Sequence, residues 1–528
     1  MFIGRKTIKA AAAVFCAVVI VGCGIGPQET KAYAASTSTP YNIDLGIGSS
    51  ETEVRICWQS NSSAAGQLQI SKTSDMKSTD FPESSTKQAI TEKVTATEGV
   101  LDNASNTDHA VSSFTDASGV ALQDEYSSKV AVSGLSANTS YTYRVGDGTT
   151  WSPNYTFQTG SAANGFTFAA FGDPQIGASG NLENDKAGWA NTLNKVYSKF
   201  PSLNFLFSMG DQVNDYNHLY TQQKEYNAFF NPTSSANYLQ THVLAAFSGN
   251  HDFQMGKYYS YHYDQPNLST LGQTKTNGVN DNNGDYWYRY GNTLFMSLEG
   301  NNFYDVSAHD AFMKQAIDAN PNVKWKVAAY HQAPYSEANH DGATTSDDDV
   351  MFMRKNWTKL MDKYGVDVVL NGHDHYYTRS FQMSGGSPVN TVKTNAVTNP
   401  KGTVYFTLDS GSGSKYYKYN TTKDHSFSAF GWQNNVPTYT YAKVTDNTFA
   451  LTTYATNSDK AIDTYTITKA KATPVAQTGK TSEAAVTSPK TGDNNGSDIY
   501  LIFTIAAGAF LIAAGCFIVI KKRKANQD

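Results

Sequence analysis

Five short groups of polar residues carry the side chains that proteins use to bind metal ions. They are Gly172-Asp173-Pro174-Gln175, Gly210-Asp211-Gln212-Val213-Asn214, Gly249-Asn250-His251-Asp252, His331-Gln332-Ala333-Pro334 and Gly372-His373-Asp374-His375. Carboxylate, amide and imidazole groups without a thiolate suit hard to borderline ions such as iron, zinc or manganese. Two such ions about 3.5 to 4 Å apart can activate a phosphoryl group and supply the attacking hydroxide. The residue types therefore indicate a dinuclear hydrolytic site.

Each polar group directly follows a run of apolar and β-branched residues. The runs are Phe166 to Phe171, Leu203 to Met209, Val243 to Phe247, Val327 to Tyr330 and Val366 to Leu370. Such runs predict buried strands, so the polar residues fall where strands end. Because α/β proteins collect catalytic groups at the carboxyl ends of their strands, we expect the five groups to meet.

The five groups resemble, in their order and in their residues, the motifs of the calcineurin-like metallophosphoesterase superfamily, and within it those of the purple acid phosphatases. Gly-Asp and Gly-Asn are ordinary turn pairs, and Asp173 and Asp211 could each be a turn former or helix cap. All five groups in order, each after a predicted strand, make that reading improbable. The resemblance implies an α/β fold in which a metallophosphoesterase double β-sheet sandwich is flanked by helices.

The resemblance also implies a role for each polar residue. Asp211 would bridge two metal ions. Asp173 and His375 would complete the first site, and Asn250, His331 and His373 the second. Two further histidines match family residues that contact the substrate phosphate and assist the leaving group: His251, and His340 nine residues after His331. We expect Asp252 to orient His251 and fix its tautomer by accepting a hydrogen bond from its ring N–H, as carboxylates beside active-site histidines do.

Two positions depart from the family pattern. Purple acid phosphatases place a metal-bound tyrosine three residues after the bridging Asp, where this chain has Asn214, with Tyr216 two residues later. We therefore expect Asn214 to support the site from behind the metal ligands and expect no iron tyrosinate. Gln175 stands where many relatives have a histidine ligand and where purple acid phosphatases have glycine. We expect its amide to hold a water or phosphate rather than a metal.

The charge and cysteine content of the chain limit which partners and cross-links are expected. The 528 residues have a formal net charge of −5, and no basic stretch occurs outside the two ends. A nucleic acid is therefore not expected as a bulk electrostatic partner. Of four cysteines, only Cys57 lies outside the terminal segments described next, so a processed chain would have no intramolecular disulfide.

The amino-terminal end is typical of an export signal. Three basic residues precede an apolar segment that runs from Ala10 to Ile25, and Ala32-Tyr33-Ala34 is a small-x-small cleavage site. Residues 1–34 are the expected signal peptide. A competing processing point is Cys23, because Ile20-Val21-Gly22-Cys23 loosely resembles a lipoprotein motif.

The carboxyl-terminal end is typical of a surface anchor. Ser488-Pro489-Lys490-Thr491-Gly492 precedes an uncharged stretch, residues 499–520, and a basic tail, residues 521–528. Such a stretch is long enough to span a bilayer, with the basic tail inside. The pentapeptide resembles a sortase substrate of Gram-positive bacteria. Cleavage between Thr491 and Gly492 would link the protein covalently to peptidoglycan in the cell wall. The alternative is a plain single-pass membrane protein.

Residues 39–160 predict an all-β domain. Four segments alternate with period two: Val54 to Trp58, Gly66 to Ile70, Lys129 to Val132 and Ser140 to Val145. The domain resembles a fibronectin type III or immunoglobulin-like sandwich and the amino-terminal domain of purple acid phosphatases. Residues 73–128 are polar and show no pattern, which indicates an insertion of unassigned role.

The catalytic domain is expected over residues 164–470. Apolar stripes predict helices from about Asn181 to Phe200, around Phe312 and Ile317, and after Ser346. Strands alone are expected after residue 402. Residues 471–498, rich in Thr, Ala, Lys and Ser, predict a linker across the wall.

These observations predict an exported, wall-anchored, dimetal hydrolase of phosphoric esters that releases orthophosphate from monoesters. A phosphodiesterase or nucleotidase with the same metals is one alternative, since the ligand set does not distinguish them. A surface binding protein without catalysis is another.

Overall fold

The computed structural model describes residues 39–96, 109–116, 121–232, 237–276, 279–281, 283–338 and 348–470. These residues belong to one compact unit that spans residues 1–470. The expected signal peptide, Cys23, His340, the linker, the sortase motif with Thr491 and Gly492, and the apolar stretch 499–520 lie outside the described residues. Within the described residues, no helix is long and apolar enough to cross a membrane.

The amino-terminal region is a two-sheet β-sandwich, as the alternating segments predict. Its strands are β1 (Tyr41–Ile47), β2 (Val54–Ser60), β3 (Gln67–Lys72), β4 (Thr86–Gln88), β5 (Ile90–Lys93), β8 (Tyr126–Val132), β9 (Ser140–Gly146) and β10 (Tyr155–Gln158). One sheet has the order β10-β9-β3-β4, and the other contains β1, β2, β8 and β5. Between the sheets lie Ile43, Trp58, Leu68 and Tyr143. Alternation puts every second side chain of each strand into this core.

The second of these sheets continues into the catalytic region. There the same sheet contains β11 (Phe166–Phe171), β12 (Phe205–Ser208), β13 (Leu244–Ala246), β23 (Ala396–Thr398), β26 (Thr438–Val444), β27 (Thr448–Ala455) and β28 (Ala461–Thr468). Strand β1 pairs in parallel with β13 through Gly46 and Leu244. The two predicted domains therefore share a sheet, which the sequence pattern did not indicate.

A separate sheet completes the catalytic core. Its order is β16 (Tyr286–Tyr290), β17 (Thr293–Ser297), β18 (Trp325–Ala329), β19 (Val368–Asn371), β24 (Val404–Thr407), β20 (Tyr377–Ser380) and β25 (Ser428–Trp432). The remaining strands are short pairs: β6 (Thr95–Ala96) with β7 (His109–Ala110), β14 (Lys275–Thr276) with β15 (Val279–Asn280), and β21 (Met383–Ser384) with β22 (Ser387–Pro388).

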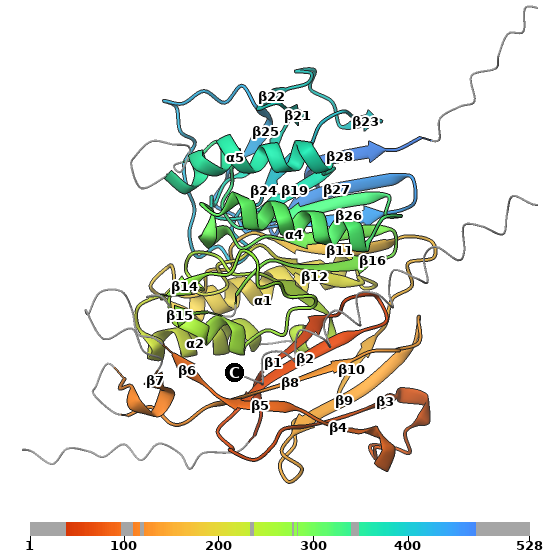
Figure 1. Cartoon of the computed structure of the whole chain (residues 1–528), viewed down its shortest axis with the longest axis vertical. Helices are drawn as coiled ribbons and strands as arrows, with labels where there is room; N and C mark the ends of the chain where they lie inside the picture. Colours follow the sequence, from red (N-terminus) through yellow and green to blue (C-terminus); the bar gives the residue numbers. More distant parts are fainter. Residues whose placement is uncertain are drawn as a thin grey trace, which may run out of the picture. The chain divides into compact units, whose positions relative to one another are not determined.

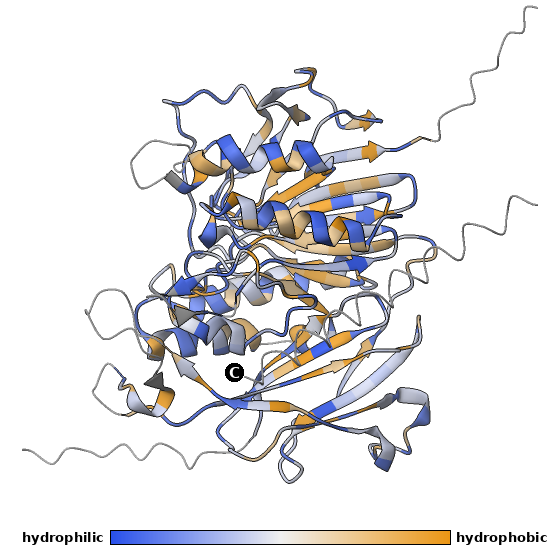
Figure 2. Cartoon of the chain, viewed as in Figure 1, coloured by the Kyte–Doolittle hydropathy of each residue, from blue (hydrophilic) through white to orange (hydrophobic). Residues whose placement is uncertain are grey.

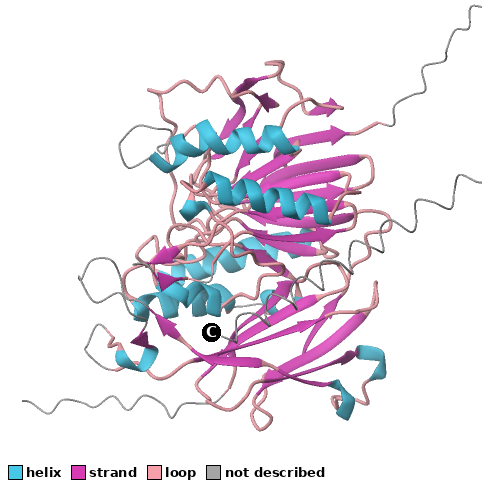
Figure 3. Ribbon diagram, viewed as in Figure 1, coloured by secondary structure: helices cyan, strands magenta, loops and turns pink. Residues whose placement is uncertain are grey.

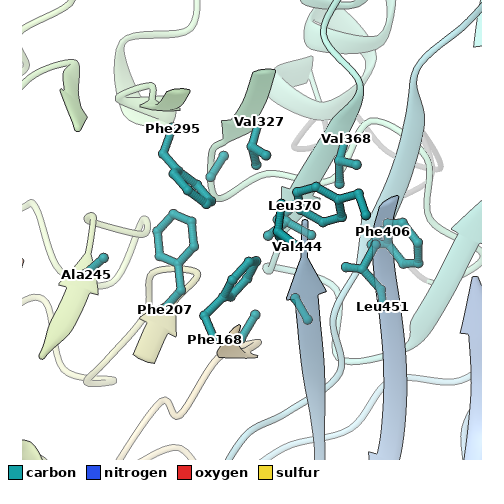
Figure 4. Packing of buried hydrophobic residues seen from close by; sticks show 14 of the residues in the cluster. Phe168, Phe207, Ala245, Phe295, Val327, Val368, Leu370, Phe406, Val444 and Leu451 are labelled. Carbon is teal, nitrogen blue, oxygen red and sulfur yellow. The ribbon is translucent and has the colours of Figure 1, made fainter. Parts of the chain in front are cut away.

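The two catalytic sheets pack face to face over an aromatic core. Figure 4 shows Phe168 and Phe207 of one sheet meeting Phe295 of the other. The rings of Phe168 and Phe295 are 5.7 Å apart and nearly perpendicular, an arrangement that aromatic pairs favour. The central strands carry much of the hydrophobic colour in Figure 2. This rigid core holds the strand ends in place.

Helices cover the outer faces of both sheets, giving four layers (Figures 1 and 3). They are α1 (Leu182–Lys199), α2 (Leu219–Phe230), α3 (Tyr238–Thr241), α4 (Val306–Ala319) and α5 (Asp348–Tyr364). Helices α1 and α2 share a core with β11 and β12, and α4 and α5 share one with β17 and β19. Short 3₁₀ turns lie at Thr73–Asp75, Glu83–Ser85, Val111–Ser113, Gly256–Tyr261 and Gly300–Asn302.

Of the five α-helices, α1, α4 and α5 agree with the sequence pattern, and α2 and the short α3 were missed. Helix α1 begins after Asn181, whose side chain accepts from the Asn184 N–H as an N-cap does. Helix α2 lacks both an N-cap hydrogen bond and an acidic first turn. Residues 73–128 are also more than a polar insertion, because Val94, Val111 and Phe114 pack into the core beneath α1 and α2.

Candidate metal centre

Five parallel strand ends position the predicted metal ligands. Strands β11, β12 and β13 run parallel in one sheet, and β18, β19 and β24 run parallel in the other. Asp173, Asp211 and Asn250 follow the ends of the first set. His331, His373 and His375 follow β18 and β19 in the second. The loops that leave these strands gather on one side of the sheets in Figure 3.

The structure brings all six side chains together. The Nε2 atom of His331 lies 3.2 Å from Asp211 Oδ2 and 3.9 Å from Asp173 Oδ2. The Nε2 atom of His375 lies 3.2 Å from Asp173 Oδ2. On the other side of the cluster, His373 Nδ1 is 3.0 Å from Asn250 Oδ1. Ligand atoms of Asp173, Asp211 and His331 lie within 4.8 Å of one another, as around a shared ion.

Hydrogen bonds to the backbone fix the tautomers of two histidines. A carbonyl can only accept, so the Nδ1–H of His331 donates to Met209 O at 2.8 Å, and that of His375 to Lys415 O at 2.8 Å. The Nε2 atom of each ring faces carboxylate oxygens, and it would offer its lone pair to a metal ion once it has lost its proton. Metal-binding histidines are oriented in this way.

Unpaired buried atoms show that the cluster fits a cation. His331 Nε2 and Asp173 Oδ2 have no hydrogen-bond partner, and both residues are almost fully buried. Burying such groups without compensation costs about 1 to 3 kcal/mol each, and more for a charged group. Carboxylate, amide and imidazole donors are those that iron, zinc and manganese accept. The residues present therefore fit the two metals that the resemblance implies.

Electrostatics lead to the same conclusion. Burial alone would raise the pKa of Asp211, but His331 and His251 hold it well below its usual range. Burial alone would lower the pKa of His331, yet Asp211 and Asp173 raise it to about 10. The cluster thus retains a positive charge beside its carboxylates, and a bound metal ion would replace that proton.

The glycines before the ligands leave no room for a side chain. A Cβ on Gly249 would lie 2.0 Å from Asp211 Oδ1, and one on Gly372 would lie 2.3 Å from Asp173 Oδ1. The backbone itself is strained at Asp211, with φ of 44°, and at His373, with φ of 69°. Residues held at positive φ cost about 1 to 3 kcal/mol each and often mark functional sites. Close packing of the loops explains the glycines that begin four of the five motifs.

Gln175 and Asn214 lie together beside the ligands. The Gln175 amide donates from Nε2 to Asn214 Oδ1 at 3.3 Å, while its buried Oε1 has no hydrogen-bond partner. Tyr216 packs edge-on against the His251 ring, with centroids 5.1 Å apart. These placements agree with supporting roles for Gln175 and Asn214 and put Tyr216 against a histidine.

Asp252 does not orient His251, so that expectation was wrong. The His251 Nδ1–H donates instead to Asn214 O at 2.5 Å. The Asp252 carboxylate accepts from the N–H groups of Gln212 and Gly249, at 3.2 and 2.8 Å. These two bonds tie the Asp211 loop to the Asn250 loop.

Two buried acids near the site were missed. Asp409 follows β24, and its Oδ1 accepts from Gln433, which also donates to His375 O. Burial raises the pKa of Asp409 to about 7. Its position just after a predicted strand was a usable signal. Glu225 on α2 accepts from the Asn214 and Asp215 N–H groups, and burial raises its pKa to about 8. Because α2 was not predicted from the sequence, Glu225 was not recognised as a residue near the site.

Comparisons with known families and proteins agree with this geometry. Residues 40–159 match the purple acid phosphatase N-terminal domain, and residues 166–377 match the calcineurin-like phosphoesterase family. The fibronectin-like character expected for the first domain is not confirmed by this match.

Curated relatives are distant. An uncharacterized protein of Mycobacterium tuberculosis is 30% identical over 101 residues, 18% of this chain and 18% of that protein, so the chain spans less than a fifth of its length. A nucleotide pyrophosphatase/phosphodiesterase of Hordeum vulgare is 23% identical over 60% of this chain and 88% of that protein. A probable inactive purple acid phosphatase of Arabidopsis thaliana is 23% identical over 62% of this chain and 56% of that protein.

Solved structures share the fold. The purple acid phosphatase from yellow lupin seeds superposes with a TM-score of 0.61 at 16% identity, covering 82% of this chain and 75% of that one. The PhoD structure gives a TM-score of 0.52 at 14% identity, covering 81% of this chain and 90% of that one. The two structures share the chain's fold, and the family matches place a purple acid phosphatase N-terminal domain at residues 40–159 and a calcineurin-like phosphoesterase domain at residues 166–377.

Proposed function

We propose that this protein is a cell-surface dimetal hydrolase that releases orthophosphate from phosphoric monoesters. The observation that carries the proposal is the meeting of six ligand side chains from five strand ends, with unpaired buried atoms facing one another. A protein that had lost metal binding would have no need of these strained loops or of buried polar atoms without hydrogen-bond partners.

Two bound ions would supply Lewis acidity and a nucleophile at neutral pH. Side chains of the protein would hold the site together, contact the phosphate and protonate the leaving group. Asp211 lies 3.2 Å from His331 Nε2 and accepts from the His251 N–H at 2.9 Å, so it links the two catalytic sheets at the site. His251 lies at the edge of the cluster, and its Nδ1–H is committed to Asn214 O. Its Nε2 is thus the nitrogen that remains to contact a phosphate oxygen or to protonate the leaving oxygen. We propose the same role, phosphate contact or protonation of the leaving oxygen, for His340.

A phosphodiesterase or nucleotidase is the second candidate. It is favoured by one observation, the match to a nucleotide pyrophosphatase/phosphodiesterase over 88% of that protein. The metal ligands do not separate the two candidates, because the surrounding loops decide which ester group fits. Other relatives are named as probable inactive phosphatases. The non-catalytic reading, a surface binding protein, predicts no phosphate release from any ester.

We also propose export and attachment to the cell wall. The supporting features are the leader at residues 1–34 and the Ser488 to Gly492 motif before the apolar stretch 499–520. A sortase and peptidoglycan would then be the partners. The phosphatase would act on esters outside a Gram-positive cell, with the helix serving only as a transient membrane anchor.

Phosphate release from p-nitrophenyl phosphate and from its bis-ester, with elemental analysis of the same sample, tests the proposal. We expect two ions per chain and faster hydrolysis of the monoester. Replacement of Asp211 or Asn250 by Ala should lower metal content together with turnover. Fewer than one ion per chain after reconstitution would refute the dinuclear site. Faster hydrolysis of the bis-ester would select the second candidate.

A further inference from the structure

The turn that follows β17 touches the loop of a metal ligand. It consists of Glu299 and the 3₁₀ residues Gly300–Asn302. The Nδ2 group of Asn301 donates to Gly249 O at 3.1 Å. Gly249 directly precedes Asn250, so this hydrogen bond holds the peptide group that carries a ligand of the second metal. Asn301 itself belongs to none of the five ligand motifs.

The same turn also contacts the loop of His331. Gln332, which directly follows His331, makes a long hydrogen bond from its Nε2 to Asn301 Oδ1 at 3.5 Å. A Cβ added to Gly300 would lie 2.0 Å from Gln332 Oε1, so the turn packs directly against this side chain. Asn250 and His331 follow strands of different sheets. The turn therefore contacts the loops of two ligands that no strand pairing joins.

The Glu299 carboxylate holds Asn301 in this orientation. Its Oε1 accepts from the Asn301 N–H at 3.1 Å and from Asn301 Nδ2 at 2.6 Å. Its Oε2 accepts from the Ser248 hydroxyl. The two Nδ2 hydrogens of Asn301 are thus used by Glu299 and by Gly249 O. Ser248 lies on the Asn250 loop as well, so the turn and this loop are joined at two points.

A buried ion pair anchors the turn at both ends. The Asp285 carboxylate accepts from the Glu299 N–H at 2.8 Å and from His309 Nδ1 at 2.8 Å. His309 Nε2 donates to Asn302 O at 3.1 Å. Because a carboxylate and a carbonyl only accept, both ring nitrogens of His309 carry protons. Asp285 and His309 are fully buried, so solvent ions screen their attraction little, and the turn is held in one position.

We propose that Asn301 is a positioning residue that sets the spacing between Asn250 and His331, two ligands of the second metal. Ligand atoms bind a metal tightly only when held within about 0.5 Å of the required geometry. The inference rests on the proposed dimetal function and adds a residue on which one of the two ions depends. His375, a ligand of the first metal, is held instead by Lys415 O on another loop. Loss of Asn301 should therefore weaken the binding of one ion only.

Elemental analysis of the zinc-loaded protein during a chelator titration tests the inference. In Asn301→Ala, Gly249 O loses its donor and the ligand loop is less restrained, so one of the two ions should bind about tenfold more weakly. Asn302→Ala is the matched control, because this amide on the same turn donates to Gln273 O and not to a ligand loop. The control should keep the wild-type affinity for both ions.

X-ray absorption at the zinc edge identifies the ion that leaves. When the weaker ion has left Asn301→Ala, the zinc that remains should have a single imidazole ligand, from His375. Two imidazole ligands, from His331 and His373, would show that the other ion had left and would overturn the inference. Thermal melts of each variant confirm that it is folded.

Gly300→Ala perturbs the turn from its other side. The added Cβ would press on Gln332, which is almost fully buried, so the same ion should be weakened even if Asn301→Ala does not fold. Equal weakening of both ions, or wild-type affinity in these folded variants, would overturn the inference, as would an equal effect of Asn302→Ala.

The wild-type protein separates this inference from the proposed function. A wild type that binds two ions but releases no phosphate would refute the proposed function, and selective loss of one ion from Asn301→Ala would still support the positioning role. A wild type that binds fewer than one ion per chain would overturn both.

Discussion

Replacing Gly249 with Ala should remove metal from a site whose ligands are all still present. The added Cβ would lie 2.0 Å from Asp211 Oδ1 and 2.4 Å from the Asp211 backbone nitrogen. Since ordinary contacts of a Cβ begin at 3.4 Å, the two loop backbones must separate by about 1.0 Å to clear the Asp211 nitrogen. The contact to a backbone atom means that rotating the Asp211 side chain cannot relieve the clash.

The separation also breaks a hydrogen bond to a charged group. The N–H of His251 donates to Asp211 Oδ1 at 2.9 Å, and it moves with Gly249. Hydrogen bonds to charged groups contribute about 1.5 to 3 kcal/mol, which corresponds to roughly 10- to 150-fold in an equilibrium constant. We therefore expect metal affinity to fall by about that factor and turnover of p-nitrophenyl phosphate to fall with it.

Gly180→Ala is the control, because a Cβ there meets nothing within 4 Å. Its φ of 76° still imposes backbone strain of about 1 to 2 kcal/mol, so it should lower the melting temperature without loss of metal. Elemental analysis across a chelator titration, together with thermal melts, measures both quantities. A Gly249→Ala protein that keeps both metals at wild-type affinity would show that Asp211 does not pack against this loop.

Four further outcomes are expected. His251→Ala should keep both metals but lose about 10²- to 10⁴-fold in turnover, less for substrates with good leaving groups; loss of metal on elemental analysis would make His251 a ligand. With Asn214 at the tyrosinate position and Tyr216 packed on His251, the metal-loaded protein should show no strong visible absorption band, and a purple preparation would contradict this. Thr491→Ala should move the protein from the wall fraction to the membrane fraction; release of the unmutated protein by detergent alone would rule out sortase processing. Burial lowers the pKa of His262 to about 3, so the unfolded chain binds this proton first as the pH falls. Stability should then decrease from about pH 6.5 toward pH 3, by up to about 5 kcal/mol, and denaturant melts of His262→Phe should show a weaker pH dependence unless His262 is solvated.

The local pattern of apolar residues in the sequence was enough to predict most strands and helices of the catalytic core. The runs before Asp173, Asp211, Asn250, His331 and His373 are apolar and β-branched, and all five form strands. Stripes of apolar residues likewise predicted α1, α4 and α5. Helix α2 was missed because its start has no capping side chain, and its stability comes from packing against α1 and the sheet.

His251 and Asp252 have different hydrogen-bond partners for a related reason. Their adjacency in the chain suggested that one orients the other. Which acceptor a ring nitrogen meets depends on how loops from different strands fold over one another. In the structure Asn214 O, 37 residues away in the chain, accepts the hydrogen bond from His251 Nδ1–H. Asp252 faces the opposite way, toward Gln212 and Gly249.

Residue types and their order along the chain, through the family resemblance they carry, were enough to predict the ligand set, because strand ends and turn glycines leave local patterns. Tertiary structure alone decided how those residues serve the site. The close approach of Gly249 to Asp211 and the burial of Asp409 both depend on distances between segments far apart in sequence. Such distances follow from how the two sheets pack, and packing is a property of the whole core that no short segment encodes.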